Sequence, residues 1–233
     1  GGRERRSSKG KKKKEFQSVR KPPAIPIILK ETGLTELHNG DEFYMENLSG
    51  DCSGQAAKNV LAAQCVLKRM SLQNAVLDRL RLLDCRLEHC DLSGAQLEKA
   101  KLDSCEFLDC RMLGANFSEA EITNAIFDNC GAKDAFFTKS KFKVAHFNGC
   151  ILRGANFEGS DLSGVLFNKC DLTGANLSGA RLAGADLRSS TIDGLAVGIA
   201  DLRGVKVTPA QALQMAALLG IMVAEVDVPD SQE

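Results

Sequence analysis

The chain has 233 residues, and its 30 Lys/Arg and 30 Asp/Glu give a formal net charge of zero at neutral pH. Residues 1–30 carry eleven basic and two acidic residues, so the remaining residues carry a net charge of −9. The sequence has no apolar run of about 18 residues, which excludes a membrane-spanning helix.

Residues 1–24 form a basic stretch with a lysine cluster, Lys9–Lys14. No apolar segment follows these charges as in a signal peptide, so the nine cysteines of the chain are expected as free thiols in a reducing, cytoplasmic setting. We expect this tail to be disordered. It could bind nucleic acid or an anionic surface, and a solvated or vector-derived tail is the alternative.

Residues 25–64 are predicted to form an amino-terminal cap that passes into weak first repeats, with Ala57 and Ala62 inside. From residue 65 the sequence repeats every five residues, as in RLLDC RLEHC DLSGA QLEKA KLDSC. The second residue of each block is apolar at 29 consecutive positions from Leu67 to Val207, and the fifth is mostly small.

A period of five residues fits neither regular element. On an α-helix the apolar positions would move by roughly 140° per step, and on a β-strand they would alternate between the two faces. The chain must therefore turn once per block, with the second and fifth residues inside. Glycine fills the fourth position in eleven blocks, as expected for a corner with positive φ.

A second period of twenty residues gives the number of sides. Cys90, Cys110 and Cys130 follow this spacing, as do Phe107 and Phe127. Four blocks then make one coil, and the array makes about seven coils, or a rod of roughly 35 Å at ~4.8 Å per coil. Thiols and rings in this register are predicted to be core filler, rather than a metal site or a base-stacking surface.

Blocks such as DLSGA, DLTGA, NLSGA and ADLRG resemble the A(D/N)LXX signature of pentapeptide-repeat proteins. The resemblance covers residues 55–207 and implies a right-handed quadrilateral parallel β-helix. We therefore predict an all-β fold with the β-helix in residues 65–207.

Residues 208–233 are predicted to close the rod. Thr208 and Pro209 are an N-cap and a first helical residue, Gly220 ends the helix, and residues 221–226 are expected as a short strand. The segment ADLRGVKVTPAQALQMAALLGIMV is similar to the carboxyl ends of quinolone-resistance (Qnr-type) pentapeptide proteins, which implies a homodimer through this end. The residues predicted for the cap and the dimer contact are Leu213, Met215, Ala217, Leu218, Leu219 and Met222.

The sequence contains no phosphate-binding loop, nucleophile elbow or dinucleotide fingerprint. With a rod filled by its own side chains and no apolar pocket, we predict a protein that is not an enzyme, needs no cofactor or metal, and acts by binding a protein partner at its surface.

Two partner classes remain open. The Qnr resemblance implies DNA mimicry on DNA gyrase or topoisomerase IV, through the one side that has an acidic excess. The acidic row predicted for this contact is Glu88, Glu106, Asp109, Asp128 and Asp186. A scaffold for an unrelated protein fits at least as well, because residues 81–204 carry 17 acidic and 14 basic residues and are nearly neutral.

Overall fold

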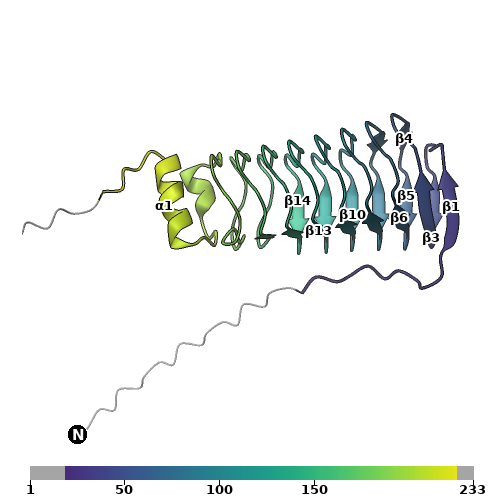
Figure 1. The fold of residues 1–233 in the computed structure, drawn as a ribbon, viewed down its shortest axis with the longest axis horizontal. Helices are drawn as coiled ribbons and strands as arrows, with labels where there is room; N and C mark the ends of the chain where they lie inside the picture. The colour runs from purple at the N-terminus through teal and green to yellow at the C-terminus, as the bar shows by residue number, and fades with distance from the viewer. Residues whose placement is uncertain (1–18, 225–233) are drawn as a thin grey trace, which may run out of the picture.

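A computed structural model describes residues 19–224 of the chain. These residues form an elongated rod in which the backbone winds in stacked coils, with strand β1 at one end and helix α1 at the other (Figure 1). Each regular residue pairs in parallel with the residue twenty positions further along, as Lys101 pairs with Glu121. The predicted four-sided parallel β-helix is confirmed.

We name the four sides of the rod A to D by their inward-pointing central residues, with one coil of each as an example. Side A is centred on Phe107, side B on Leu102, side C on Leu97 and side D on Leu92, and the same side recurs every twenty residues. All central residues from Leu67 to Ile192 are buried. The first and third residues of each block point outward, and the fourth forms the corner to the next side.

Side A carries an eight-stranded parallel sheet that begins at the amino-terminal end of the rod and ends at Asn168, after which single bridges continue it to Asp186 and Lys206. Its strands, in spatial order, are β1 (Lys30–Leu34), β3 (Glu46–Gly50), β6 (Val66–Lys68), β9 (Arg86–Glu88), β11 (Glu106–Leu108), β13 (Ile126–Asp128), β15 (His146–Asn148) and β16 (Leu166–Asn168).

Side B carries a six-stranded sheet, and side C begins with a two-stranded one. The strands of side B are β2 (Glu42–Tyr44), β5 (Leu61–Ala63), β8 (Arg81–Leu83), β10 (Lys101–Asp103), β12 (Glu121–Thr123) and β14 (Lys141–Lys143), and those of side C are β4 (Ala56–Lys58) and β7 (Val76–Asp78). Elsewhere on the rod single bridges such as Asp91 to Arg111 continue the ladder.

The amino-terminal cap is already part of the solenoid. Strand β1 pairs with β3 sixteen residues later, and β3 pairs with β6 nineteen residues later, before the period settles at twenty. Ala57 and Ala62 are buried, as predicted. The first coils are shorter than the others, which is why their repeats are weak in the sequence.

The corners use the left-handed backbone conformation whether or not glycine is present. Gly94 and Gly114 have φ near +65°, at 67° and 62°, as their position in the block predicts. Lys139 and even the β-branched Val144 adopt the same conformation, each with φ of 56°. Because left-handed backbone is costly for a β-branched residue, the stacked coils must impose it there.

The carboxyl end departs from the regular array before residue 207. A 3-10 helix, η1 (Ile199–Leu202), replaces part of the last coil, and Leu202 and Val207 are only half-buried. Helix α1 (Pro209–Leu218) follows with Thr208 as N-cap, and Gly220 has φ of 76°, as predicted. The predicted strand at residues 221–226 is wrong for 221–224, which form no strand, and 225–226 lie outside the described residues. Within residues 19–224 no further coil follows helix α1 that could pair with such a strand.

Phenylalanine fills the middle of the core as two parallel stacks, between leucine-rich coils on either side. On side A the ring centroids of Phe107 and Phe127 are 4.7 Å apart and those of Phe127 and Phe147 are 4.6 Å apart. On side C, Phe117, Phe137 and Phe157 stack at 5.3 and 4.9 Å. The two stacks meet edge to face, the arrangement that aromatic quadrupoles favour. The prediction that the rings are core filler is confirmed.

Candidate functional site

Side A brings the five residues of the predicted acidic row onto one outer surface. Strands β9, β11 and β13 place Glu88, Glu106 and Asp128 in three successive coils. Asp109 lies at the corner next to β11, and Asp186 lies one coil beyond β16. All five residues lie on side A or at its corner, and the role of the row in binding stays a prediction.

Most of this row is already paired within the rod. Glu88 lies 3.8 Å from the Arg86 guanidinium and 3.9 Å from the Lys68 amine. Asp186 accepts from Arg188 at 2.7 Å. Asp109 lies 3.9 Å from the His89 ring. Among the described residues Asp128 makes no ion pair, so side A is not the continuous negative strip that the charges in the sequence suggested.

Glu106 is the most embedded member of the row. Its register points it outward, yet the residue is only 8% exposed. The Arg86 Nε donates to one carboxylate oxygen at 2.8 Å, and the Arg20 Nη2 donates to the other at 2.9 Å. The two guanidinium groups supply the charge-assisted hydrogen bonds that a buried carboxylate requires.

Arg20 belongs to residues 19–29, which we call the arm. The arm runs beside the rod from the β1 end toward the α1 end (Figure 1). The Ala24 amide donates to Asp84 Oδ1 at 2.9 Å, and Gln64 Nε2 donates to the Ala24 carbonyl at 3.0 Å. The prediction of disorder through residue 24 is therefore wrong for residues 19–24, because side chains of the rod bind them. The lysine cluster lies outside the described residues.

The positive charge of Arg20 also reaches His146, two coils beyond Glu106 on the same side. Burial, and then the nearby Arg20 guanidinium, lower the pKa of His146 below its usual value. The Arg20 guanidinium thus pairs with the Glu106 carboxylate and also disfavours the protonated form of the His146 ring.

The thiols are structural hydrogen-bond donors. All nine cysteines are free and buried, with Cys52 at a central position. The Cys130 Sγ donates to the Phe107 carbonyl at 3.4 Å, and Ser140 Oγ makes the equivalent bond at 2.7 Å to Phe117. Burial raises the pKa of the Cys105 thiol to about 12, which keeps it protonated. Within residues 19–224 no group of three metal-ligating side chains is brought together.

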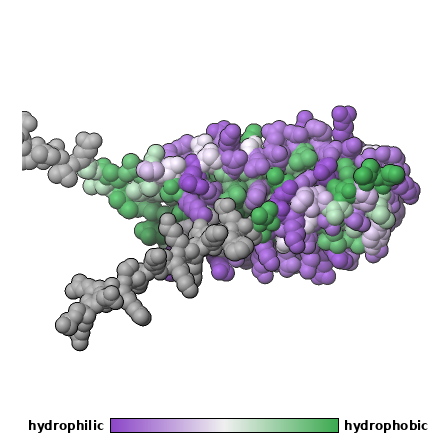
Figure 2. Space-filling view, turned by 90° about the horizontal axis from the view of Figure 1, so that it is seen from below, coloured by the Kyte–Doolittle hydropathy of each residue, from purple (hydrophilic) through white to green (hydrophobic). Residues whose placement is uncertain are grey.

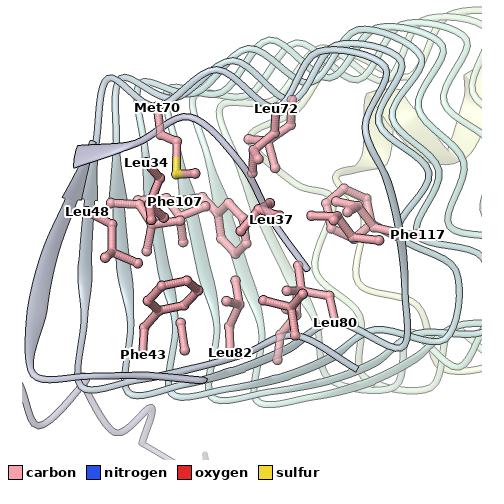
Figure 3. A pocket seen from close by; sticks show the side chains of 18 residues that line it. Leu34, Leu37, Phe43, Leu48, Met70, Leu72, Leu80, Leu82, Phe107 and Phe117 are labelled. Carbon is pink, nitrogen blue, oxygen red and sulfur yellow. The ribbon is translucent and has the colours of Figure 1, made fainter. Parts of the chain in front are cut away.

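An apolar cavity runs inside the first coils of the rod, contrary to the prediction of a completely filled core. It has a volume of about 30 Å³ and is lined by Leu34, Leu72 and Phe107 among others (Figure 3). Leucines line this half of the core, and they occupy less of the cross-section than the phenylalanines that follow. A cavity of this size holds about one water molecule and is too small for a substrate.

The predicted cap and dimer residues separate into two groups. Met215 is buried against the last coil, and Leu219 is partly covered. Leu213, Ala217, Leu218 and Met222 are exposed, Met222 at 94%. Figure 2 shows apolar residues gathered at this end, whereas most of the shaft is hydrophilic. In the described part of the chain, no helix is long and apolar enough to span a bilayer.

Gln211 is a functional cap residue that sequence reasoning missed. The residue is buried, and its Nε2 donates to the carbonyls of Leu187 and Ser190 at 2.7 and 2.8 Å. It satisfies two backbone acceptors that the last coil leaves without a partner strand. Its position three residues after Thr208, in a capping box, was the available signal.

Comparison with protein families agrees with this geometry. The family model described as "Pentapeptide repeat region" matches residues 80–157, and the one described as "Pentapeptide repeats (8 copies)" matches residues 59–94, 150–188 and 166–207. Together these matches run without a gap from residue 59 to residue 207. The chain belongs to the pentapeptide-repeat family. No curated protein sequence matches this pentapeptide-repeat protein.

Solved structures of other pentapeptide-repeat proteins are similar to it. HetL, involved in heterocyst differentiation regulation in the cyanobacterium Nostoc, is 20% identical with a TM-score of 0.48, over 76% of this chain and 86% of HetL. A trypsin-treated variant of QnrB1, a plasmid-mediated fluoroquinolone resistance protein, is 24% identical with a TM-score of 0.40, over 85% of this chain and 100% of QnrB1. At these values the likenesses name no partner for this chain.

Proposed function

We propose that this pentapeptide-repeat protein is a non-enzymatic binding module that docks a protein partner along side A, in a reducing, cytoplasmic compartment. The observation that carries the proposal is the arm itself. Side A and its corner bind an extended segment through the backbone of Ala24 and the charge of Arg20. A surface that holds one extended chain in this way has the chemistry to hold another.

The core supports binding rather than catalysis. The titratable residues of the interior are thiols that act as donors to backbone carbonyls, and the internal cavity of about 30 Å³ has no room for a substrate. What remains for function is the outer surface of the four sides and the two ends.

The test compares single charge reversals on different sides of the rod. Asp128→Lys alters side A, Lys141→Glu side B, Glu98→Lys side C and Asp193→Lys side D. All four residues point outward, so the fold is expected to tolerate each change. Affinity pull-downs from cells of the source, quantified by mass spectrometry, are expected to lose one partner with Asp128→Lys alone. A partner profile that is identical for all four variants would contradict the proposal.

DNA mimicry on DNA gyrase or topoisomerase IV is the second candidate. The alignment of Glu88, Glu106 and Asp128 in successive coils of side A favours it, and the ion pairs along this row reduce its resemblance to a duplex, which carries one charge per ~1.7 Å. A supercoiling assay with purified gyrase, with and without ciprofloxacin, tests the candidate. If the protein at micromolar concentration neither inhibits gyrase nor protects it from ciprofloxacin, DNA mimicry is eliminated.

We also infer a homodimer through the α1 end. Leu213, Leu218, Ile221 and Met222 are exposed together there, and an apolar patch of this kind at the end of a rod favours self-association. Sedimentation velocity at micromolar concentration is expected to give twice the mass of one chain, and Leu213→Glu to give the monomer. A wild-type protein that sediments as a monomer would rule the dimer out.

A further inference from the structure

The arm has a composition that suits docking as an extended peptide. Pro22, Pro23 and Pro26 lie between Arg20 and the first strand. Proline fixes φ and has no backbone N–H, so this segment cannot add a strand to the ladder and is pre-organised in an extended form. Such a peptide loses little conformational entropy on binding.

Two corner residues grip the arm at its backbone. Gln64 and Asp84 occupy the same corner, between sides B and A, in neighbouring coils, with φ of 55° and 51°. Gln64 donates to the Ala24 carbonyl and Asp84 accepts from the Ala24 amide. Because both bonds are to main-chain atoms, the grip does not depend on which side chain stands at position 24.

The second point of attachment is selective for arginine. The carboxylate of Glu106 is held by Arg86 and presents its other oxygen to Arg20. The Arg20 side chain is 16% exposed, a burial that a guanidinium tolerates only when its donors are bonded.

The arm does not satisfy this attachment fully. The Arg20 Nη1 is buried, and among the described residues it has no hydrogen-bond partner. A buried donor without a partner costs free energy, so a peptide that supplies an acceptor beside its arginine would bind better than the arm. Another peptide can therefore replace the arm at this contact.

We propose that the edge formed by Gln64, Asp84, Arg86 and Glu106 is a docking surface for an extended, proline-rich peptide with an arginine four residues before the gripped backbone, and that a partner's peptide displaces the arm from it. The inference rests on the proposed function and adds the chemistry of the partner's segment: arginine, one variable residue, then a proline pair. In the intact chain the arm competes for this edge and therefore lowers the affinity of the edge for a peptide from another molecule.

The test uses the full chain. Arg20→Glu removes the arm's attachment to Glu106 and leaves the residues of the edge unchanged. A fluorescein-labelled peptide of residues 19–29 is titrated with wild-type and Arg20→Glu protein, and fluorescence anisotropy is measured. We expect at least about tenfold tighter binding to Arg20→Glu protein, since a charge-assisted hydrogen bond no longer holds the competitor. A peptide with Arg20→Glu is the matched control and is expected not to bind.

A second variant locates the bound peptide. Adding Glu106→Gln to the Arg20→Glu protein is expected to weaken peptide binding at least about tenfold, whereas adding Glu121→Gln on side B leaves it unchanged. In the otherwise wild-type chain, Glu106→Gln is expected to speed tryptic cleavage after Arg20 by a similar factor.

Equal binding to wild-type and Arg20→Glu protein, or binding that Glu106→Gln does not weaken, would overturn the inference. Cleavage after Arg20 at the same rate in wild-type and Glu106→Gln protein would overturn it as well. If the peptide fails to bind while Asp128→Lys still abolishes partner capture, the inference is wrong and the proposed function stands. If the peptide binds but no charge reversal on side A loses a partner, the proposed function is wrong and the inference about the peptide stands.

Discussion

Phe136 and Phe137 are neighbours in the sequence, but the first side chain is exposed and the second is buried. Phe137 is completely buried, stacked between Phe117 and Phe157 and edge-on to the other stack. Phe136 points outward from side C and is 44% exposed. Replacing each by alanine tests the five-residue register directly, because the chemical change is the same at both positions.

The magnitudes follow from burial and packing. A buried Phe→Ala change costs about 3–5 kcal/mol, and the loss of stacked and edge-on ring pairs places Phe137→Ala near the upper end of that range. Phe136 buries only about half of its surface, so Phe136→Ala loses about 1 kcal/mol at ~25 cal/mol per Å². The two variants are expected to differ by about 4 kcal/mol.

Urea denaturation followed by far-UV circular dichroism measures the difference, since the chain has no tryptophan. The midpoint of Phe137→Ala is expected well below that of Phe136→Ala. Coils of a solenoid can unfold in stages, so the midpoints of both variants are compared with those of the wild type under one protocol. Similar losses for the two variants would refute the assignment of inward and outward positions.

The remaining predictions concern the thiols, a tight backbone contact and a histidine. Cys130→Ser is expected to keep wild-type stability within about 1 kcal/mol, because serine makes the same bond at Ser140, whereas Cys130→Val loses about 1–3 kcal/mol in thermal denaturation. Gly50→Ala is expected to lower the free energy of unfolding by at least about 2 kcal/mol, because Gly50 has a φ of +131° and an added Cβ would collide with the Leu34 carbonyl. At Gly54 an added Cβ meets open space, so Gly54→Ala is expected to lower it by only about 1 kcal/mol. The lowered pKa of His146 means that the unfolded chain binds a proton at this histidine more readily than the folded chain does. Wild-type stability is therefore expected to fall relative to His146→Gln as the pH drops from 7 through the usual histidine pKa of about 6.5. A constant difference between these two proteins from pH 7 to pH 5 would contradict that assignment.

The sequence determined the solenoid because the constraint is local and repeated. A five-residue period at Leu67, Leu72 and Leu77 has no solution as a helix or strand, so it predicts the turn after every block. The twenty-residue spacing of Cys90 and Cys110 adds the four sides. Thr208, Pro209 and Gly220 marked helix α1 through capping chemistry that depends only on near neighbours.

Only the tertiary structure decided how the surface is used. The charge count of side A was visible in the sequence, but its pairing was not, because Glu106 and Arg20 are 86 residues apart and meet through the path of the arm. The same holds for Gln211, whose bonds to the last coil depend on how helix α1 folds back over it. Contacts between a repeat array and its irregular ends carry no period, so their partners cannot be read from the spacing that specifies the rod.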